Sequence, residues 1–310
     1  MLYIFLTRKA LCDMIYQNAQ FGRLKMKIGI GNYYLNRYGA ENGARIMAEH
    51  GYECIDFNLS DTETDYYSAK EEFFFVAVNK IRAALNKSGI TVNQIHGPWR
   101  FPPRDATEDD RAERFGKMTK AAAIAKYLGA KYMIVHPLMP FGIDENINPD
   151  EVYEINKKFF TALSDVVGKL GVTVCLENMP FKNFSLSSTS AIITLIKDIN
   201  NPHLKFCFDT GHANLIGEDP RESVLTAGGD LLKTVHIHDN LSDTDSHLPP
   251  YDGNIDWAEF MEALYDIGYV GTVNLETAPQ KISGFDKMTA EQIKDAELSI
   301  AKVAKLLAGI

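Results

Sequence analysis

The sequence has few cysteines and no long hydrophobic segment. Four of the 310 residues are cysteines, and no two of them form a Cys-x-x-Cys pair of the kind that binds zinc or carries out redox chemistry. Cys54, Cys175 and Cys207 lie in apolar, strand-like runs, where a buried and reduced thiol is the ordinary state. No apolar run approaches the roughly 20 residues of a membrane helix, and residues 2–6 are too short for the apolar part of a secretion signal. These absences favour a cytoplasmic protein without a membrane partner.

Positive charge is also scarce. The chain has 32 Lys and Arg against 41 Asp and Glu, a formal net charge of −9, and it has no basic run longer than a few residues. Because nucleic acids are bound through clustered Lys and Arg, we expect no nucleic-acid partner. A small anionic substrate stays open, since a metal ion and a few local cations outweigh distant charge. Arg100, Arg104 and Lys182 lie in predicted loops and are candidates for such cations.

No linker or low-complexity tract divides the chain into separate domains. A length of 310 residues suits two ordinary domains or one α/β barrel, which needs about 250 residues. A regular pattern begins at Met26. We therefore predict an N-terminal extension, residues 1–25, followed by one domain, residues 26–310. Self-association into a homo-oligomer is left open.

From Met26 onward, short β-branched runs alternate with longer amphipathic runs, as expected for β-α units around a parallel sheet. The predicted strands are residues 27–31, 53–59, 92–96, 132–136, 173–177, 205–209, 234–238 and 272–276. The predicted helices are residues 40–50, 71–87, 107–128, 149–170, 188–199, 256–267 and 290–307, with a weaker one near 219–227. About eight such units close into a (β/α)8 barrel.

Residues that start and stop helices support this pattern. Thr107 can cap the third helix, with Asp109 and Asp110 in its first turn. Asn148 can cap the fourth helix, and Pro149 then stands at the first helical position, where its missing N–H has no cost. Five glycines follow predicted helices, as residues in the left-handed conformation do. They are Gly51, Gly89, Gly129, Gly171 and Gly268.

Histidine and acidic side chains gather at the ends of the predicted strands. Glu177, Asp209 and Glu276 each end a strand, and six of the eight histidines lie at strand ends or in the loops that follow. These histidines are His96, His136, His212, His236, His238 and His247. In a barrel of this kind the carboxyl ends of all strands meet on one face. We therefore expect these side chains to surround a single cavity.

Strand alternation turns these acidic side chains inward. Val174 and Leu176 suit packing against the outer helices, so Glu177 faces the barrel interior. The same parity turns inward the side chains of Asp209, Glu276, His236 and His238. Unpaired carboxylates in an apolar interior are very costly, and a divalent cation with imidazole ligands neutralises them. The sequence therefore predicts a divalent metal, with an oxygen and nitrogen shell that suits Mn, Mg, Co or Zn.

Several short motifs at these positions resemble the xylose-isomerase-like barrel superfamily, which contains sugar and sugar-phosphate isomerases and epimerases, inosose dehydratases and endonuclease IV. The resemblance runs from Met26 to the C-terminus and is more specific for the superfamily than for one activity. In chain order the motifs are His96-Gly97-Pro98, His136-Pro137, Leu176-Glu177-Asn178, Asp209-Thr210-Gly211-His212, His236-Ile237-His238-Asp239, His247-Leu248-Pro249-Pro250 with Gly253-Asn254-Ile255-Asp256-Trp257, and Asn274-Leu275-Glu276.

The resemblance to the sugar epimerases implies a role for each of these residues. The metal ligands would be Glu177, Asp209, His236 and Glu276. His236 is preferred over His238 because the family pattern places the ligand three residues before an acid. The side chains facing the substrate would be His96, Trp99, His136, His212, His238 and His247.

The implied activity is that of a metal-dependent sugar or sugar-phosphate isomerase or epimerase with a small-molecule sugar as substrate. Moving a proton on the carbon next to a carbonyl requires a base, an acid and a group that stabilises the enediolate. Glu177 and Glu276, on opposite walls, can act as base and acid while the metal bears the developing negative charge.

Two other activities within the superfamily stay open, an endonuclease IV-like phosphodiester hydrolase and an inosose-type dehydratase. Endonuclease IV binds three zinc ions, and its larger set of ligands has counterparts at His96, His136, Glu177, Asp209, His212, His236, Asp245, His247 and Glu276. The acidic net charge and the absence of basic loops favour the sugar enzyme. One departure from the sugar pattern is Tyr251-Asp252-Gly253, where relatives often have Pro-Gly-x-Gly.

Overall fold

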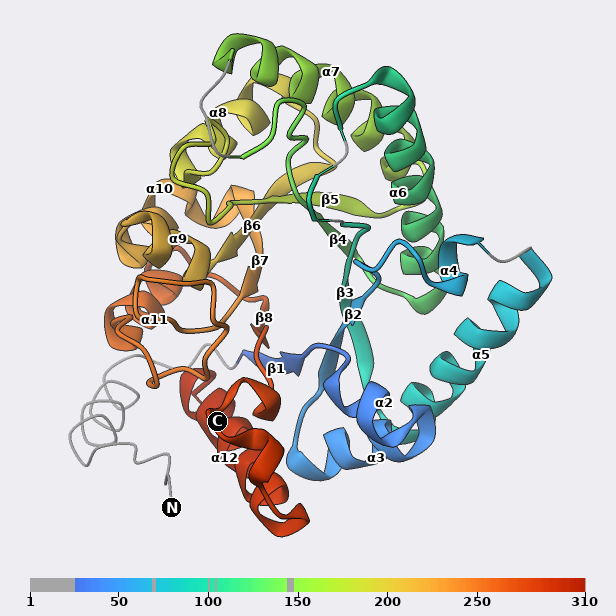
Figure 1. The fold of residues 1–310 in the computed structure, drawn as a ribbon, viewed down its shortest axis with the longest axis vertical. Coiled ribbons are helices and arrows are strands. Elements are labelled where there is room, and N and C mark those ends of the chain that lie inside the picture. The colour runs from blue at the N-terminus through green and yellow to red at the C-terminus, as the bar shows by residue number, and fades with distance from the viewer. Residues whose placement is uncertain (1–25, 69–70, 100, 104, 144–147, 310) are drawn as a thin grey trace.

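The computed structural model describes residues 26–68, 71–99, 101–103, 105–143 and 148–309. In this part of the chain, eight parallel strands form one sheet in the order β7-β6-β5-β4-β3-β2-β1-β8, and helices surround it (Figure 1). A parallel bridge between Ile237 and Leu275 links the two outermost strands, so the sheet nearly closes. The predicted barrel fold is confirmed. The predicted extension, residues 1–25, lies outside the described residues.

The eight predicted strands are all present, with ends that differ from the prediction by at most two residues. The strand β7 shows the largest shift, because it begins and ends two residues earlier than predicted. The strands are β1 (Lys27–Ile30), β2 (Cys54–Asn58), β3 (Thr91–His96), β4 (Tyr132–Val135), β5 (Thr173–Glu177), β6 (Leu204–Asp209), β7 (Leu232–His236) and β8 (Thr272–Leu275).

The predicted helices are also present, and short additional ones lie in the loops. The long helices are α3 (Ala40–His50), α5 (Glu71–Ser88), α6 (Glu108–Leu128), α7 (Pro149–Gly168), α8 (Thr189–Ile199), α10 (Pro220–Leu231), α11 (Trp257–Asp266) and α12 (Ala290–Leu307). The short ones are α2 (Tyr33–Tyr38), α4 (Asp65–Ser68), α9 (Thr210–Ile216) and the 3-10 turns η1 (Pro279–Lys281) and η2 (Phe285–Lys287).

One of the two predicted helix caps is confirmed and the other is wrong. The Thr107 side chain accepts a hydrogen bond from the Asp110 backbone N–H, and the Asp110 carboxylate accepts one from the Thr107 N–H. Pro149 does begin α7, but Asn148 makes no side-chain cap. Asn148 is in the left-handed conformation, with φ 47° and ψ 58°, whereas a capping residue needs extended backbone to reach the first helical amides.

The predicted glycine stops and strand parity are confirmed. Gly51, Gly89, Gly129, Gly171 and Gly268 all have positive φ. Phe206 and Phe208 belong to the main core between strands and helices, and the ring of Phe208 stacks on Phe260 of α11 at 6.0 Å. The opposite face of the strands forms a separate interior cluster of Ile134, Cys175 and Cys207. These cysteines are buried and free, as predicted, and they form the apolar layer beneath the polar end of the barrel.

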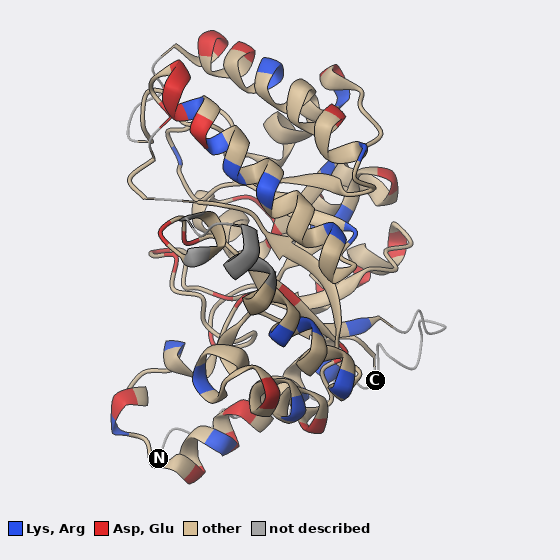
Figure 2. Ribbon diagram, turned by 90° about the vertical axis from the view of Figure 1, so that its right-hand side faces the viewer, with Lys and Arg blue, Asp and Glu red and all other residues tan. Residues whose placement is uncertain are grey.

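Charge is mixed on the outer surface. Figure 2 shows Lys and Arg interspersed with Asp and Glu along the helices, without a segregated basic face in this view. Among the described residues, no helix is both long enough and apolar enough to cross a membrane.

Removing the Thr107 hydroxyl tests how far this capping box stabilises α6. We expect Thr107→Ala to lower the free energy of unfolding by about 1 kcal/mol, because the hydroxyl no longer accepts from the Asp110 backbone N–H or donates to the Asp110 carboxylate. Thr161→Ala, at an exposed position inside α7, is the matched control and should change stability by less than about 0.5 kcal/mol. Urea unfolding measures both. Equal losses in the two variants would contradict a capping role.

Candidate metal centre and active site

The four predicted metal ligands converge at the carboxyl end of the barrel. Glu177 ends β5, Asp209 ends β6, His236 ends β7, and Glu276 follows β8. One ligand atom from each lies within 4.8 Å of the others. Bonds from zinc to imidazole nitrogen or carboxylate oxygen are about 2.0–2.2 Å long, so small side-chain movements are enough for these four atoms to reach one ion. Two or more carboxylates with one imidazole also suit manganese and cobalt.

His236 lies at the centre of this group. Its Nδ1 is 2.6 Å from Glu177 Oε1 and 3.0 Å from Glu276 Oε2, and 4.0 Å from Asp209 Oδ2. His238 instead faces Asp209, with its Nε2 3.0 Å from that carboxylate. Of the two histidines of β7 and its extension, His236 is therefore the one surrounded by the three acids.

The sequence analysis missed Asp56, which fixes the other side of the His236 ring. Asp56 Oδ2 accepts a hydrogen bond from His236 Nε2 at 2.9 Å, and it also accepts amide hydrogen bonds from Gln94 and Asn274. Because the carboxylate oxygens on both sides of the ring are acceptors, Nε2 donates to Asp56 and Nδ1 carries a proton toward Glu177, and a metal held by the acids would replace the Nδ1 proton. A histidine that binds a metal usually donates its second N–H to such a partner. Asp56 lies in the middle of β2, whereas the predicted site residues lie at the ends of strands or in the loops that follow them.

Burial and the neighbouring charges strongly shift the pKa values of the carboxylates and imidazoles in this site. Burial alone would raise the pKa of Glu177, but the imidazoles of His236 and His136 hold it well below its usual range. Burial alone would lower the pKa of His236, yet Glu276 and Glu177 raise it well above its ordinary value. Burial lowers the pKa of His136 to about 4, partly opposed by Glu177. Glu177 is therefore ionised and His136 is neutral near pH 7.

A second group of possible ligands adjoins Glu177. Its Oε2 is 2.9 Å from His136 Nε2 and 3.8 Å from His96 Nε2. His96 uses its Nδ1 to contact the Gly97 carbonyl at 2.9 Å, which leaves Nε2 facing the acid. Trp99 packs edge-on against His136 with ring centres 4.5 Å apart. These three residues, predicted to face the substrate, thus lie together on one side of the metal group.

A third group surrounds Asp245 in the loop after β7. His212 Nε2 and His247 Nε2 lie 3.5 Å and 3.4 Å from Asp245 Oδ2. The rings of His238 and His247 stack at 3.9 Å. Gly211 permits the approach of His238, because a Cβ at that position would lie 2.0 Å from its ring. Asp245 raises the pKa of His247 to about 9 against the effect of burial, so His247 is positively charged.

The groups described so far border a cavity of about 510 Å³. Trp99, Phe101, Met179, Pro180, Phe181 and Leu215 form its apolar part, and the polar part is formed by Asn58, Ser60, His96, His136, Glu177, His212, Asp245, His247 and Glu276. A cavity of about 300–1,000 Å³ with convergent polar groups is typical of a small-molecule site.

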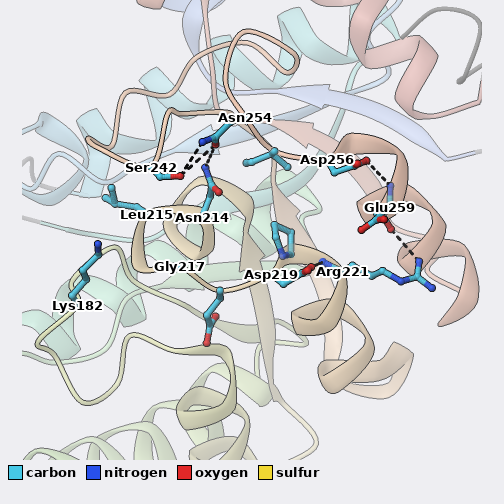
Figure 3. A pocket seen from close by; sticks show the side chains of 13 residues that line it. Lys182, Asn214, Leu215, Gly217, Asp219, Arg221, Ser242, Asn254, Asp256 and Glu259 are labelled. Carbon is cyan, nitrogen blue, oxygen red and sulfur yellow. Dashed lines mark hydrogen bonds between the residues drawn. The ribbon is translucent and has the colours of Figure 1, made fainter. Parts of the chain in front are cut away.

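Of the three rim cations considered from the sequence, Lys182 lies among the described residues, and it does not line this cavity. Arg100 and Arg104 lie outside the described residues. Lys182 lines a separate depression of about 370 Å³, shown in Figure 3 together with Asn214 and Arg221. There Arg221 pairs with Glu262 at 2.8 Å, and Asp219 and Asp256 cap α10 and α11. The polar groups of this depression thus mostly serve the fold.

Comparison with known proteins agrees with this architecture. Residues 44–302 match the family model described as a xylose isomerase-like TIM barrel. The chain belongs to this family. It is 28% identical over 264 residues to the uncharacterised protein MJ1311 of Methanocaldococcus jannaschii, covering 82% of this chain and 84% of that one.

The curated relatives with named activities match a smaller part of the chain. D-psicose 3-epimerase of Ruminiclostridium cellulolyticum is 25% identical over 238 residues, covering 74% of this chain and 75% of the relative. A probable endonuclease 4 of Metamycoplasma arthritidis is 30% identical over 175 residues, covering 52% of this chain and 59% of the relative. The crystal structure of the IOLI protein with a bound zinc atom has a TM-score of 0.72 and 20% identity, and covers 90% of this chain and 98% of that one.

Substitution of Asp56 tests its contact with His236. We expect Asp56→Ala to weaken metal binding by about 10- to 100-fold, as loss of such a partner does in other metal sites. Asp56→Asn should have a smaller effect, because its amide oxygen can still accept from His236. Competition titration with a fluorescent chelator measures the affinity, and the exposed Asp286→Asn is the control. Unchanged affinity in Asp56→Ala would contradict the role.

Proposed function

We propose that the protein is a divalent-metal-dependent isomerase or epimerase of a sugar ketone, acting by proton transfer next to the carbonyl. The observation that carries this proposal is the convergence of Glu177, Asp209, His236 and Glu276 on one point beside a cavity of about 510 Å³. Family membership supports an enzyme, and the named epimerase relative supports this class of reaction. The zinc in the IOLI structure supports a resident metal.

The chemistry follows from the residues that meet in the cavity. Glu177 ends β5 and Glu276 follows β8, and their carboxylates lie 2.6 Å and 3.0 Å from His236 Nδ1. The pKa of Glu276 is lowered, against the effect of burial, by His236 and His247. Both glutamates are thus ionised, so either can accept the proton from carbon, and the other takes up a proton from solvent before it returns one to the opposite face. A bound divalent ion would polarise the carbonyl and make that proton more acidic.

The remaining side chains can hold and orient the substrate. His136 and His247 line the cavity, where the single N–H of the neutral His136 ring faces Glu177 at 2.9 Å and the charged ring of His247 faces Asp245 at 3.4 Å. Trp99 and Phe181 provide apolar surface on the same cavity. The stacked rings of Phe101 and Phe181, 6.4 Å apart, lie at its mouth, because Phe101 is 64% exposed. Apolar walls of this kind limit water around the reacting carbon.

A second candidate function is phosphodiester hydrolysis with three metal ions. The observation that favours it is that His96, His136 and Glu177 form one further group of ligand atoms within 4.8 Å, and His238, Asp245 and His247 form another. The relative called a probable endonuclease 4 also supports it. The net charge of −9 and the mixed surface in Figure 2 oppose binding to a nucleic-acid backbone.

Metal content distinguishes these two functions. We expect one ion per chain in protein purified without chelators, measured by mass spectrometry of the metals, because among the described residues a single group combines three carboxylates with an imidazole. Glu177→Gln and Asp209→Asn should abolish its retention and reduce activity by at least about 10²-fold, while circular dichroism shows a retained fold, since barrel stability resides in the apolar layers below.

His96→Ala is the control for this measurement, because His96 belongs to the second ligand group but lies 3.8 Å from Glu177, and it should retain the single ion. Three zinc ions per chain, with cleavage of a DNA strand at an abasic site, would support the hydrolase instead. Glutamine and asparagine variants that fail to fold, together with a wild-type protein that carries no metal, would show that these acids are structural.

Isotope exchange tests the proton-transfer step. In deuterated water, the enzyme with its metal should introduce deuterium at the carbon next to the carbonyl of a ketose it accepts, because a proton held on a carboxylate exchanges with solvent before it is returned. Nuclear magnetic resonance locates the label. Glu276→Gln should lower the exchange rate by about 10²- to 10⁴-fold. Transfer of label between two substrate carbons without solvent exchange would indicate a hydride shift and exclude the two-glutamate scheme.

A further inference from the structure

A second cavity adjoins the metal cavity on the side of β1 and β2. Its volume is about 610 Å³, larger than that of the metal cavity. Both cavities are lined by Asn58, His247 and Glu276. The two spaces are therefore neighbouring compartments at one end of the barrel, with these three residues between them.

Glu276 stands at the junction of the two cavities. Its carboxylate lies 3.0 Å from His236 Nδ1 in the metal group, while Thr277 and Ala278, which follow it, line the second cavity. The Glu276 side chain is 25% exposed, whereas that of Glu177 is 1% exposed. A substrate carbon placed against Glu276 thus faces an open compartment beyond it, and a substituent on that side of the substrate has space to occupy.

The lining of the second cavity matches a neutral polyhydroxylated ring. Tyr66 and Ile81 are partly exposed in this lining and provide aromatic and apolar surface, on which the C–H face of a sugar can pack. Asn36 and Gln280 are exposed at its edge, and neither side chain makes a hydrogen bond to another described residue. Carboxamides offer both a donor and an acceptor, as hydroxyl groups require.

The charges in this compartment do not suit a phosphate group. Among the described residues of its lining, Lys281 and His247 are basic, and Asp61 and Glu276 are acidic. Phosphate sites in proteins combine several cations or an open helix N-terminus. The balance of two basic and two acidic residues favours an uncharged ligand.

We propose that the substrate is a two-unit carbohydrate, in which a keto sugar reacts in the metal cavity and a second neutral sugar ring, joined to it by a glycosidic bond, occupies the compartment lined by Asn36 and Gln280. This inference rests on the proposed isomerase or epimerase function. It specifies the substrate class of that same site.

Solvent exchange with substrates of two sizes tests the inference. The metal-loaded enzyme is incubated in deuterated water with D-fructose and with four glucosyl-fructose disaccharides, trehalulose, turanose, maltulose and isomaltulose, which differ in linkage. We expect at least one disaccharide to be labelled next to its carbonyl with a kcat/KM at least tenfold above that of D-fructose. Labelling of D-fructose at an equal or higher rate than every disaccharide would overturn the inference and leave the proposed function intact. Labelling of no ketose of either size would overturn both.

Two variants locate the second ring. Asn36→Ala and Gln280→Ala should each raise KM for the preferred disaccharide by about three- to tenfold, the effect of one lost neutral hydrogen bond. The kcat for that disaccharide and the kinetics with D-fructose should stay unchanged. Asn86→Ala, on the exposed face near the end of α5, is the matched control. Equal changes with both substrates, or no change with either, would show that the second ring does not bind in this compartment.

Discussion

The polar end of the barrel depends on the pairing between His236 and the acids on both sides of its ring. Asp56 accepts a hydrogen bond from one ring nitrogen, and Glu177 and Glu276 face the other. Without this imidazole, three carboxylates would stand within a few ångströms of one another in a buried space, where like charges repel strongly. The ring fixes the positions of the acids, and their arrangement in turn creates a point at which one divalent ion would find oxygen and nitrogen ligands.

Strand alternation then divides the barrel into layers with different tasks. Outward side chains such as Phe206 and Phe208 join the helices in the main core, while Ile134, Cys175 and Cys207 fill the interior below the acids. Burial raises the pKa of the Cys175 thiol to about 12, so this layer stays uncharged. An apolar interior layer keeps water from reaching the acids from below, and the side chains that determine chemistry are confined to one end of the barrel.

Much of this arrangement was predictable because it follows from strand parity and from the convergence of strand ends. Glu177 illustrates the strength of that reasoning, since two apolar neighbours are enough to turn it inward. Asp56 has the same signal, lying between the outward residues Ile55 and Phe57, but it stands in the middle of its strand, whereas the predicted site residues were those at strand ends. Asn148 shows a different limit. Its residue type suits a cap, yet its backbone conformation is set by a loop whose path no local pattern determines.

A further buried carboxylate, that of Asp239, holds the long loop after β7 in place. It accepts hydrogen bonds from the backbone N–H groups of Asn240, Tyr251 and Ile255 and from the indole N–H of Trp257, and its own backbone pairs with Leu248. These contacts close the long loop that carries Asp245 and His247.

Asp239 also gives a physical reason for the sequence pattern in which an acid follows the proposed metal ligand, His236, by three positions. The acid need not touch that histidine, since its contacts are with the loop. Gly253 is part of the same constraint, because a Cβ there would lie 2.1 Å from Asp239 Oδ1. Strand β7 positions His236, whereas the loop held by Asp239 positions His247. The candidate metal ligands and the substrate-facing side chains are therefore positioned by two separate parts of the structure. Variation in the loop can therefore change which substrate fits while the metal group at the strand ends remains the same, as expected for a barrel whose loops determine specificity.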